Sequence, residues 1–127
     1  MTSPDTIPIY TAAERGLSEA MLADYRSAGV LVIEDFVPVD ACRKLRERAL
    51  QLVDEFDPQT VRHVFSTTKQ TQLDDSYFYE SGDKIRFFLE DDAFGADGQL
   101  KASKENSLNK MGHAMHDLDP VFDAFSH

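Results

Sequence analysis

The sequence has few of the features that would place a chain outside the cell or in a membrane. It holds a single cysteine, Cys42, so no disulfide can form within the chain, and this favours a reducing compartment. No basic segment followed by an apolar run opens the chain, and no apolar stretch is long enough to cross a bilayer. We therefore expect a cytoplasmic protein with no membrane partner.

Basic residues are also scarce. Lysine and arginine number 13 against 23 aspartates and glutamates, which gives a formal net charge of −10. Nucleic-acid phosphates are bound through clustered lysine and arginine side chains, so this balance predicts that nucleic acid is not a partner. A small anionic ligand is compatible with the charge, because one nearby cation can outweigh the distant field at short range.

Tryptophan is absent, but other bulky apolar side chains are plentiful. The 127 residues include nine phenylalanines and four tyrosines, and 42% of the chain is hydrophobic against 28% charged. This balance is typical of one soluble globular domain rather than of a disordered chain.

The first part of the chain shows helix and strand signals in alternation. Residues 1–16 are polar and contain two prolines, so we expect a flexible N-terminus there. Ser18 is a suitable helix N-cap and Gly29 a suitable stop, which predicts a helix between them. The apolar, largely β-branched run of residues 30–33 predicts a buried strand.

Residues 40–56 carry the clearest helical pattern. Apolar side chains recur every three or four positions, charged side chains occupy the other faces, and Pro58 ends the pattern. Cys42 lies on the apolar stripe, so we interpret it as a small core residue rather than a reactive thiol.

A loop and an aromatic-rich region follow this helix. Residues 63–75 are polar and lack periodicity, which indicates a loop. Two aromatic-rich runs, residues 77–80 and 85–89, flank a Ser-Gly-Asp break and predict a β-hairpin.

The last part of the chain carries a turn signal and a helical pattern. Asp97 and Gly98 indicate a turn. Apolar residues at helical spacing over residues 108–122 predict a helix that Pro120 ends early. Taken together, the elements predict an α+β fold.

Two histidines offer a possible metal-binding pattern. On the predicted helix, His113 and His116 occupy neighbouring positions three residues apart, so they could share a metal ion. A third ligand would have to come from elsewhere in the chain. In addition, no histidine has an acidic residue two positions later, as iron sites with two histidines and one carboxylate usually require. The pattern therefore weighs against a metal site.

Lys110 and Arg86 could bind an anion. Lys110 falls on the polar face of the predicted helix. Its ammonium group could bind a carboxylate or could simply be solvated, and the helical periodicity does not distinguish these two roles. Arg86 could bind a carboxylate or phosphate through two donors. A cross-strand ion pair is the commoner role of such a residue, and it is the interpretation we favour.

Two longer motifs resemble a known family. Residues 81–90 and residues 107–116, the latter followed by residues 119–122, closely resemble the phytanoyl-CoA dioxygenase family and its subgroup of phytanoyl-CoA dioxygenase domain-containing proteins. Residues 25–36 are similar to the opening helix and strand of that family. The resemblance covers residues 17–127, which it identifies as the N-terminal portion of such a domain.

The resemblance implies a double-stranded β-helix, or jelly-roll, oxygenase that uses Fe(II), 2-oxoglutarate and O₂ to hydroxylate a small-molecule or acyl substrate. Lys110 matches the family lysine that contacts 2-oxoglutarate, whereas His113 and His116 match positions that are not iron ligands. The family's iron ligands, and its arginine for the far carboxylate of 2-oxoglutarate, lie beyond the part that this chain matches. We therefore predict no catalytic or metal-binding residue here and no stable binding of either cofactor by this chain alone.

Three functional hypotheses follow. The first is the N-terminal fragment of an oxygenase that lacks the metal-binding core strands. Such a fragment would expose apolar surface, including residues 85–89, Met111 and Met115, and could self-associate. The second is a non-catalytic acidic interaction domain that retains the N-terminal fold. The third and weakest is a helical metal-binding module that uses His113 and His116.

Overall fold

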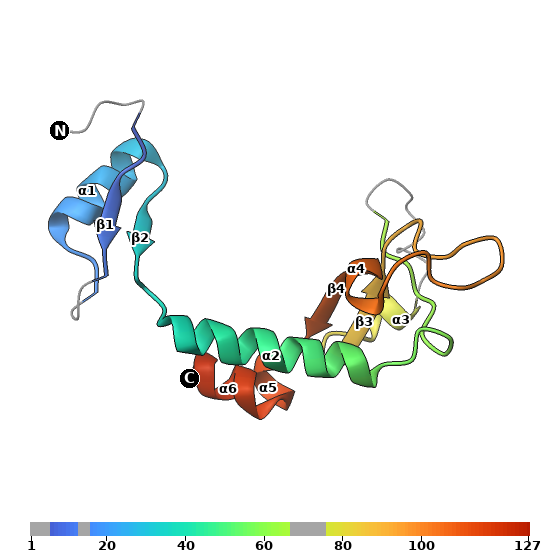
Figure 1. The fold of residues 1–127 in the computed structure, drawn as a ribbon. Helices are drawn as coiled ribbons and strands as arrows, with labels where there is room; N and C mark the ends of the chain where they lie inside the picture. Colours follow the sequence, from blue (N-terminus) through green and yellow to red (C-terminus); the bar gives the residue numbers. More distant parts are fainter. Residues whose placement is uncertain (1–5, 13–15, 67–75) are drawn as a thin grey trace. The chain divides into compact units, whose positions relative to one another are not determined.

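The computed structural model describes residues 6–12, 16–66 and 76–127 (Figure 1). The chain divides into two compact units, Met1–Cys42 and Arg43–His127, and each contains a two-stranded sheet. Helices and strands are mixed along the chain, which confirms the α+β prediction.

The first unit combines a small parallel sheet with one helix. Strand β1 (Ile9–Thr11) pairs with β2 (Val32–Glu34), and α1 (Glu19–Ala28) lies between them in the sequence. The strand predicted over residues 30–33 is present, but it begins at Val32. The prediction that it is buried is wrong, because Val32 is 39% exposed.

The caps of α1 are as the sequence predicts. The Ser18 hydroxyl accepts a hydrogen bond from the Met21 N–H, and Gly29 adopts a left-handed φ of 72° that favours glycine. Strand β1 was not predicted and lies within the segment expected to be flexible. The Tyr10 hydroxyl, on β1, donates a hydrogen bond of 2.7 Å to Asp24 on α1, which links the two elements.

Helix α2 (Val39–Glu55) confirms the clearest helical prediction. Its C-terminal turns face the core of the second unit, which consists of Val53, Phe56, Leu89 and Ala93. Cys42 is exposed, so its assignment to the core is wrong. The apolar stripe of α2 reaches this core only at its far end, and Cys42 lies in the first turns.

The central sheet of the second unit pairs strands that are distant in the sequence. Strand β3 (Ile85–Leu89) is antiparallel to β4 (Leu108–His113), with Phe88 opposite Lys110. The predicted hairpin is wrong, because its first half forms the short helix α3 (Ser76–Tyr79). An aromatic run this short is compatible with either a strand or a helical turn. Here the run forms a helical turn, in which the Tyr77 and Phe78 rings pack against Phe88 of β3.

The predicted loop over residues 63–75 is only partly described. Val64 forms a parallel bridge with Leu89, and the Phe65 N–H donates a hydrogen bond of 2.9 Å to the Leu89 carbonyl oxygen. The start of this segment therefore runs beside β3. Residues 67–75 lie outside the described residues.

The helix predicted over residues 108–122 is wrong in its first half. That stretch forms β4, and α5 (Met115–Leu118) and α6 (Pro120–Ser126) follow it. Pro120 begins α6 instead of ending a helix, which suits a residue that has no N–H to donate. Strand pairing with β3 outweighs the helical spacing of the apolar residues.

Two shorter features complete the second unit. Helix α4 (Lys104–Ser107) precedes β4. The turn predicted at Asp97 and Gly98 is confirmed, since the Gly98 N–H donates a 3.0 Å hydrogen bond to the Gly95 carbonyl oxygen and Gly98 has φ 78°. Across the described ranges, no helix combines the length and apolar character needed to span a membrane.

Candidate functional site

Lys110 lies among aromatic rings on β4. Its Nζ atom is 3.6 Å from the ring centroid of Phe65, 4.7 Å from that of Phe78 and 5.0 Å from that of Phe88. An ammonium group at these distances is attracted by the negative faces of the rings. The predicted cofactor-binding residue is therefore on a strand, and not on the polar face of a helix.

Three separate segments bring these rings to Lys110. Phe88 is buried on β3 directly across from Lys110, so the pleat places both side chains on one face of the sheet. Phe65 is brought alongside by its main-chain bond to β3, and Phe78 belongs to α3. We call Phe65, Phe78 and Phe88 the aromatic cage.

The cage removes part of the solvent around the ammonium group. This burial lowers the pKa of Lys110 below its ordinary value. None of the described carboxylates forms an ion pair with Lys110. Because charges attract more strongly where water is excluded, an anionic group that reached Lys110 would be held more firmly than at an open surface.

Ser81 and His113 lie beside the cage. Ser81 is fully buried, and its Oγ is 2.5 Å from the Phe78 carbonyl oxygen and 2.7 Å from His113 Nδ1. The His113 ring meets Phe78 edge-on, with 5.9 Å between centroids, and lies 6.0 Å from the Phe88 ring. His113 is thus held by a hydroxyl and packed against two rings of the cage.

Arg86 is engaged in holding α3. Its Nη1 donates a 2.5 Å hydrogen bond to the Tyr77 carbonyl oxygen, and its guanidinium lies 4.3 Å from the Tyr77 ring centroid. Glu80 forms a looser ion pair with it at 3.8 Å. These contacts support the structural interpretation of Arg86, although its partners are on α3 and the following turn rather than on a neighbouring strand.

The described residues do not bring His113 and His116 together as metal ligands. His113 ends β4 and is bound to Ser81, whereas His116 lies in α5 with its Nε2 3.5 Å from Asp117. Among the residues that the structure describes, no three histidine, cysteine, aspartate or glutamate side chains are close enough to hold a metal ion. This part of the chain does not fit an iron site.

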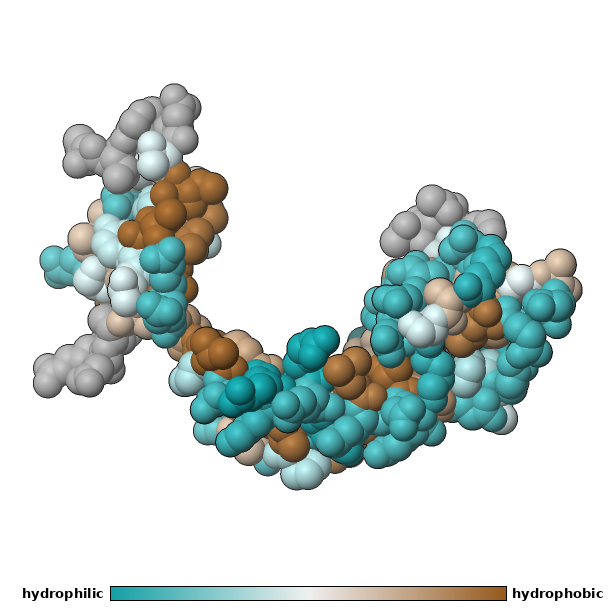
Figure 2. All heavy atoms as spheres, viewed as in Figure 1, coloured by the Kyte–Doolittle hydropathy of each residue, from teal (hydrophilic) through white to brown (hydrophobic). Residues whose placement is uncertain are grey.

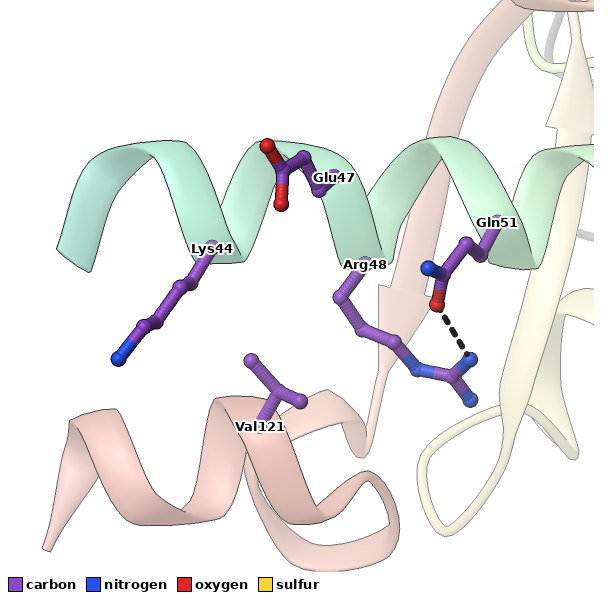
Figure 3. Close-up of a pocket in the computed structure, with 5 residues that line it drawn as sticks. All are labelled: Lys44, Glu47, Arg48, Gln51 and Val121. Carbon is purple, nitrogen blue, oxygen red and sulfur yellow. Dashed lines mark hydrogen bonds between the residues drawn. The ribbon is translucent and has the colours of Figure 1, made fainter. Parts of the chain in front are cut away.

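A separate hollow lies between α2 and α6 (Figure 3). Its volume is about 210 Å³, and it is lined by Lys44, Glu47, Arg48, Gln51 and Val121. The Arg48 guanidinium donates to Gln51 at 3.2 Å and to the buried carboxylate of Asp119 at 2.6 Å. Because Arg48 already holds α6 to α2, we interpret this hollow as a gap in helix packing and not as a ligand site.

Sequence reasoning found Lys110 but not its surroundings. Phe65 lay in a presumed loop, Phe78 in a presumed strand and Ser81 in a presumed turn. The only signal that could have linked them was the density of aromatic residues on both sides of Ser81. That density does not reveal which segment pairs with β3.

Comparisons with known proteins give a consistent family match for this chain. The family model described as phytanoyl-CoA dioxygenase (PhyH) matches residues 25–127. A phytanoyl-CoA dioxygenase of Arabidopsis thaliana is 46% identical over 111 residues, which are 87% of this chain and 39% of that relative. The phytanoyl-CoA dioxygenase domain-containing protein 1 of Bos taurus is 40% identical over 116 residues, which cover 87% of this chain and 40% of the relative.

A similar protein from Dictyostelium discoideum, a phytanoyl-CoA dioxygenase domain-containing protein 1 homolog, is 39% identical over 111 residues. This chain covers 39% of that relative too, so it spans well under half the length of the curated relatives it matches. The matched region contains β3, β4 and the aromatic cage around Lys110. The chain belongs to the phytanoyl-CoA dioxygenase family.

Proposed function

We propose that this chain is the N-terminal portion of an Fe(II)- and 2-oxoglutarate-dependent dioxygenase that hydroxylates a small-molecule or acyl substrate. Family membership over residues 25–127 is the observation that carries the proposal. In the complete protein, a jelly roll would supply the remaining strands of the domain. The cytoplasm is the proposed compartment.

Lys110 is the residue that we assign to 2-oxoglutarate. Its ammonium group lies within the aromatic cage and has no carboxylate partner among the described residues. A carboxylate of 2-oxoglutarate would accept a charge-assisted hydrogen bond from Nζ, which is roughly twice as strong as a neutral one. The rings would limit competition from water on their side of the ammonium group.

Iron has no comparable place in the described residues. Because no three suitable ligands lie together there, we place the ligands of the complete enzyme outside this part of the chain and assign no catalytic residue within it. When bound, iron and 2-oxoglutarate would supply the oxidising chemistry, and Lys110 would contribute by orienting the cosubstrate.

The role of Lys110 can be tested by titrating the complete protein with 2-oxoglutarate in a calorimeter, because the 127-residue chain alone is not expected to hold the cosubstrate stably. Lys110→Met removes the charge while keeping a long side chain, and we expect it to weaken 2-oxoglutarate binding by about tenfold or more, as loss of a charged hydrogen bond implies. Lys101→Met is a matched control, because Lys101 is 52% exposed and pairs only loosely with Asp92 at 3.5 Å. Equal affinities for wild type and Lys110→Met would refute the assignment.

Titration of the 127-residue chain with Fe(II) and 2-oxoglutarate, together with an assay for succinate, tests the placement of the iron ligands. We expect neither stoichiometric iron binding nor succinate from the 127-residue chain. Stoichiometric iron with turnover of 2-oxoglutarate would show that the ligands lie within this sequence. In that case the proposed location of the active site would be wrong.

A further inference from the structure

A single buried hydroxyl links the aromatic cage to a histidine. The Ser81 hydroxyl contacts both the Phe78 carbonyl oxygen, at 2.5 Å, and His113 Nδ1, at 2.7 Å. A carbonyl oxygen can only accept, so the one hydrogen of the hydroxyl is directed to Phe78. Ser81 Oγ must then accept a hydrogen bond from Nδ1–H of His113. This pairing keeps a proton on Nδ1 in both the neutral and the charged ring.

Both hydrogen bonds of the Ser81 hydroxyl help to position the Phe78 ring. The hydroxyl holds the main chain of Phe78, and the imidazole that it orients packs edge-on against the Phe78 ring at 5.9 Å. That ring in turn lies 4.7 Å from Lys110 Nζ. Ser81 is fully buried, so water cannot replace either hydrogen bond without a change in packing.

We propose that Ser81 and His113 are positioning residues for carboxylate recognition at Lys110, acting through the Phe78 ring. This inference rests on the proposed role of Lys110 in binding 2-oxoglutarate. Ser81 sets the tautomer and orientation of His113, and His113 keeps Phe78 against the lysine. The Phe78 ring is thereby held in place before any ligand binds. This lowers the conformational entropy that binding would otherwise cost.

The Ser81 hydroxyl can be removed without disrupting the main chain around it. The Ser81 N–H also donates to the Phe78 carbonyl oxygen, at 3.1 Å, so Ser81→Ala keeps the main-chain turn. Further anchoring comes from the Lys84 carbonyl oxygen, which accepts hydrogen bonds from the N–H groups of His113 and Ala114. The variant therefore loses the orientation of the imidazole and not the attachment of the turn to β4.

Two substitutions of His113 provide a matched comparison. In His113→Asn the side-chain NH₂ occupies nearly the place of Nδ1–H and can still donate to Ser81 Oγ. The longer side chain of His113→Gln places its NH₂ nearer the position of Nε2. His113 is exposed, so neither change buries a new group. The asparagine should therefore preserve the hydrogen bond and the glutamine should lose it.

The ring contacts are measured by NMR on the 127-residue chain, and the affinity for 2-oxoglutarate is measured by calorimetric titration of the complete protein. In wild type we expect contacts between the Phe78 ring protons and the Lys110 ε-methylene protons, together with an upfield ring-current shift of the latter. Ser81→Ala and His113→Gln should weaken the contacts, reduce the shift and lower the affinity for 2-oxoglutarate roughly three- to tenfold. His113→Asn keeps the hydrogen bond to Ser81 but lacks the imidazole ring, so it should disturb all three properties less than His113→Gln does.

The inference is overturned if Ser81→Ala leaves the Phe78–Lys110 contacts unchanged, or if His113→Asn disturbs them as much as His113→Gln. General loss of structure would alter amide signals throughout the chain, and the His113 pair would then decide alone. Failure of the complete protein to bind 2-oxoglutarate would count against the role of Lys110, whereas the ring contacts in the 127-residue chain would still report on Ser81 and His113.

Discussion

Asp119 is the residue whose charge has the most direct structural consequence. It is 2% exposed, forms an ion pair of 2.6 Å with Arg48 and accepts hydrogen bonds from the N–H groups of Val121 and Phe122 at the start of α6. Burial by itself would raise the pKa of this carboxyl group. The hydrogen bonds and the charge of Arg48 outweigh burial, and the net effect lowers the pKa below its usual value.

The lowered pKa predicts a pH-dependent contribution to stability. A carboxyl group whose pKa is lower in the folded state stabilises that state above its unfolded pKa, near 4, and loses the contribution as pH falls through the folded value. We expect Asp119→Asn to reduce the free energy of unfolding by about 1.5–3 kcal/mol at pH 7. The reduction should shrink as pH falls below the unfolded pKa, because the wild-type carboxyl group becomes protonated as pH passes through its lowered folded pKa.

Urea unfolding at pH 7 and at successively lower pH, monitored by circular dichroism, measures this difference. Asp117→Asn is the control, because Asp117 is 63% exposed and pairs only with the exposed His116. An Asp119→Asn effect that is independent of pH would mean that shape and capping, and not charge, account for the contribution of Asp119.

At the same scale, the sequence could indicate which single residues carry chemistry but not what surrounds them. Lys110 was found through a motif, and its ammonium group suits a carboxylate wherever it lies. The aromatic cage depends on Phe65 and Phe78 reaching one strand face from two other segments, and no local pattern encodes that. For the same reason Arg86 could be weighed as structural, but its partners on α3 could not be named.

At the scale of elements, Lys104 holds the end of the main helix. Its ammonium group donates hydrogen bonds to the carbonyl oxygens of Asp54 and Phe56 and lies 5.5 Å from the Phe56 ring centroid. The last carbonyl groups of a helix lack partners within the helix, and a cation there also interacts favourably with the helix dipole. A residue fifty positions away thus replaces a local C-cap for α2.

We therefore expect Lys104→Met to lower the free energy of unfolding by about 1 kcal/mol, since it removes the donor and the charge but keeps the aliphatic stem. Chemical denaturation measures the effect, and Lys101→Met again removes an exposed charge from the neighbouring loop. If both variants shift the midpoint equally, the loss reflects net charge, and Lys104 does not act as a cap.

The elements that were predicted correctly are those whose signals are local. Helix α1 begins after Ser18, whose side chain caps it, and ends at Gly29, whose φ angle is left-handed. In α2, apolar side chains recur at helical spacing over many residues. Strands β1 and β4 were missed because each is defined by a distant partner. The apolar spacing of residues 108–118 suits a helix, but pairing with β3 supplies main-chain hydrogen bonds to residues 108–113, and Leu108 and Met111 pack against the core.

At the scale of the molecule, apolar surface lies in places other than those expected. In the second unit, Phe88 and Leu89 are almost fully buried, so the expectation that residues 85–89 are exposed is wrong for them. In the first unit, Ile9 and Val32 face each other across the parallel sheet and are 59% and 39% exposed. Apolar side chains gather on the visible face of that unit (Figure 2).

This exposed sheet predicts self-association of the chain. Parallel strands are normally covered on both faces, and an open edge with apolar side chains is a template for pairing with another copy. Sedimentation velocity should show association that increases with concentration, and the double variant Ile9→Thr with Val32→Thr should reduce it while retaining β-forming side chains.

Leu118→Thr is the comparison for that experiment, because Leu118 is 56% exposed but lies in the second unit. If it reduces association as much as the double variant does, general hydrophobicity is responsible and the sheet of the first unit is not. A strictly monomeric wild type that binds no hydrophobic dye would contradict the prediction altogether. Such a chain would favour the acidic interaction domain, because its isolated fold would then be complete enough to remain soluble alone.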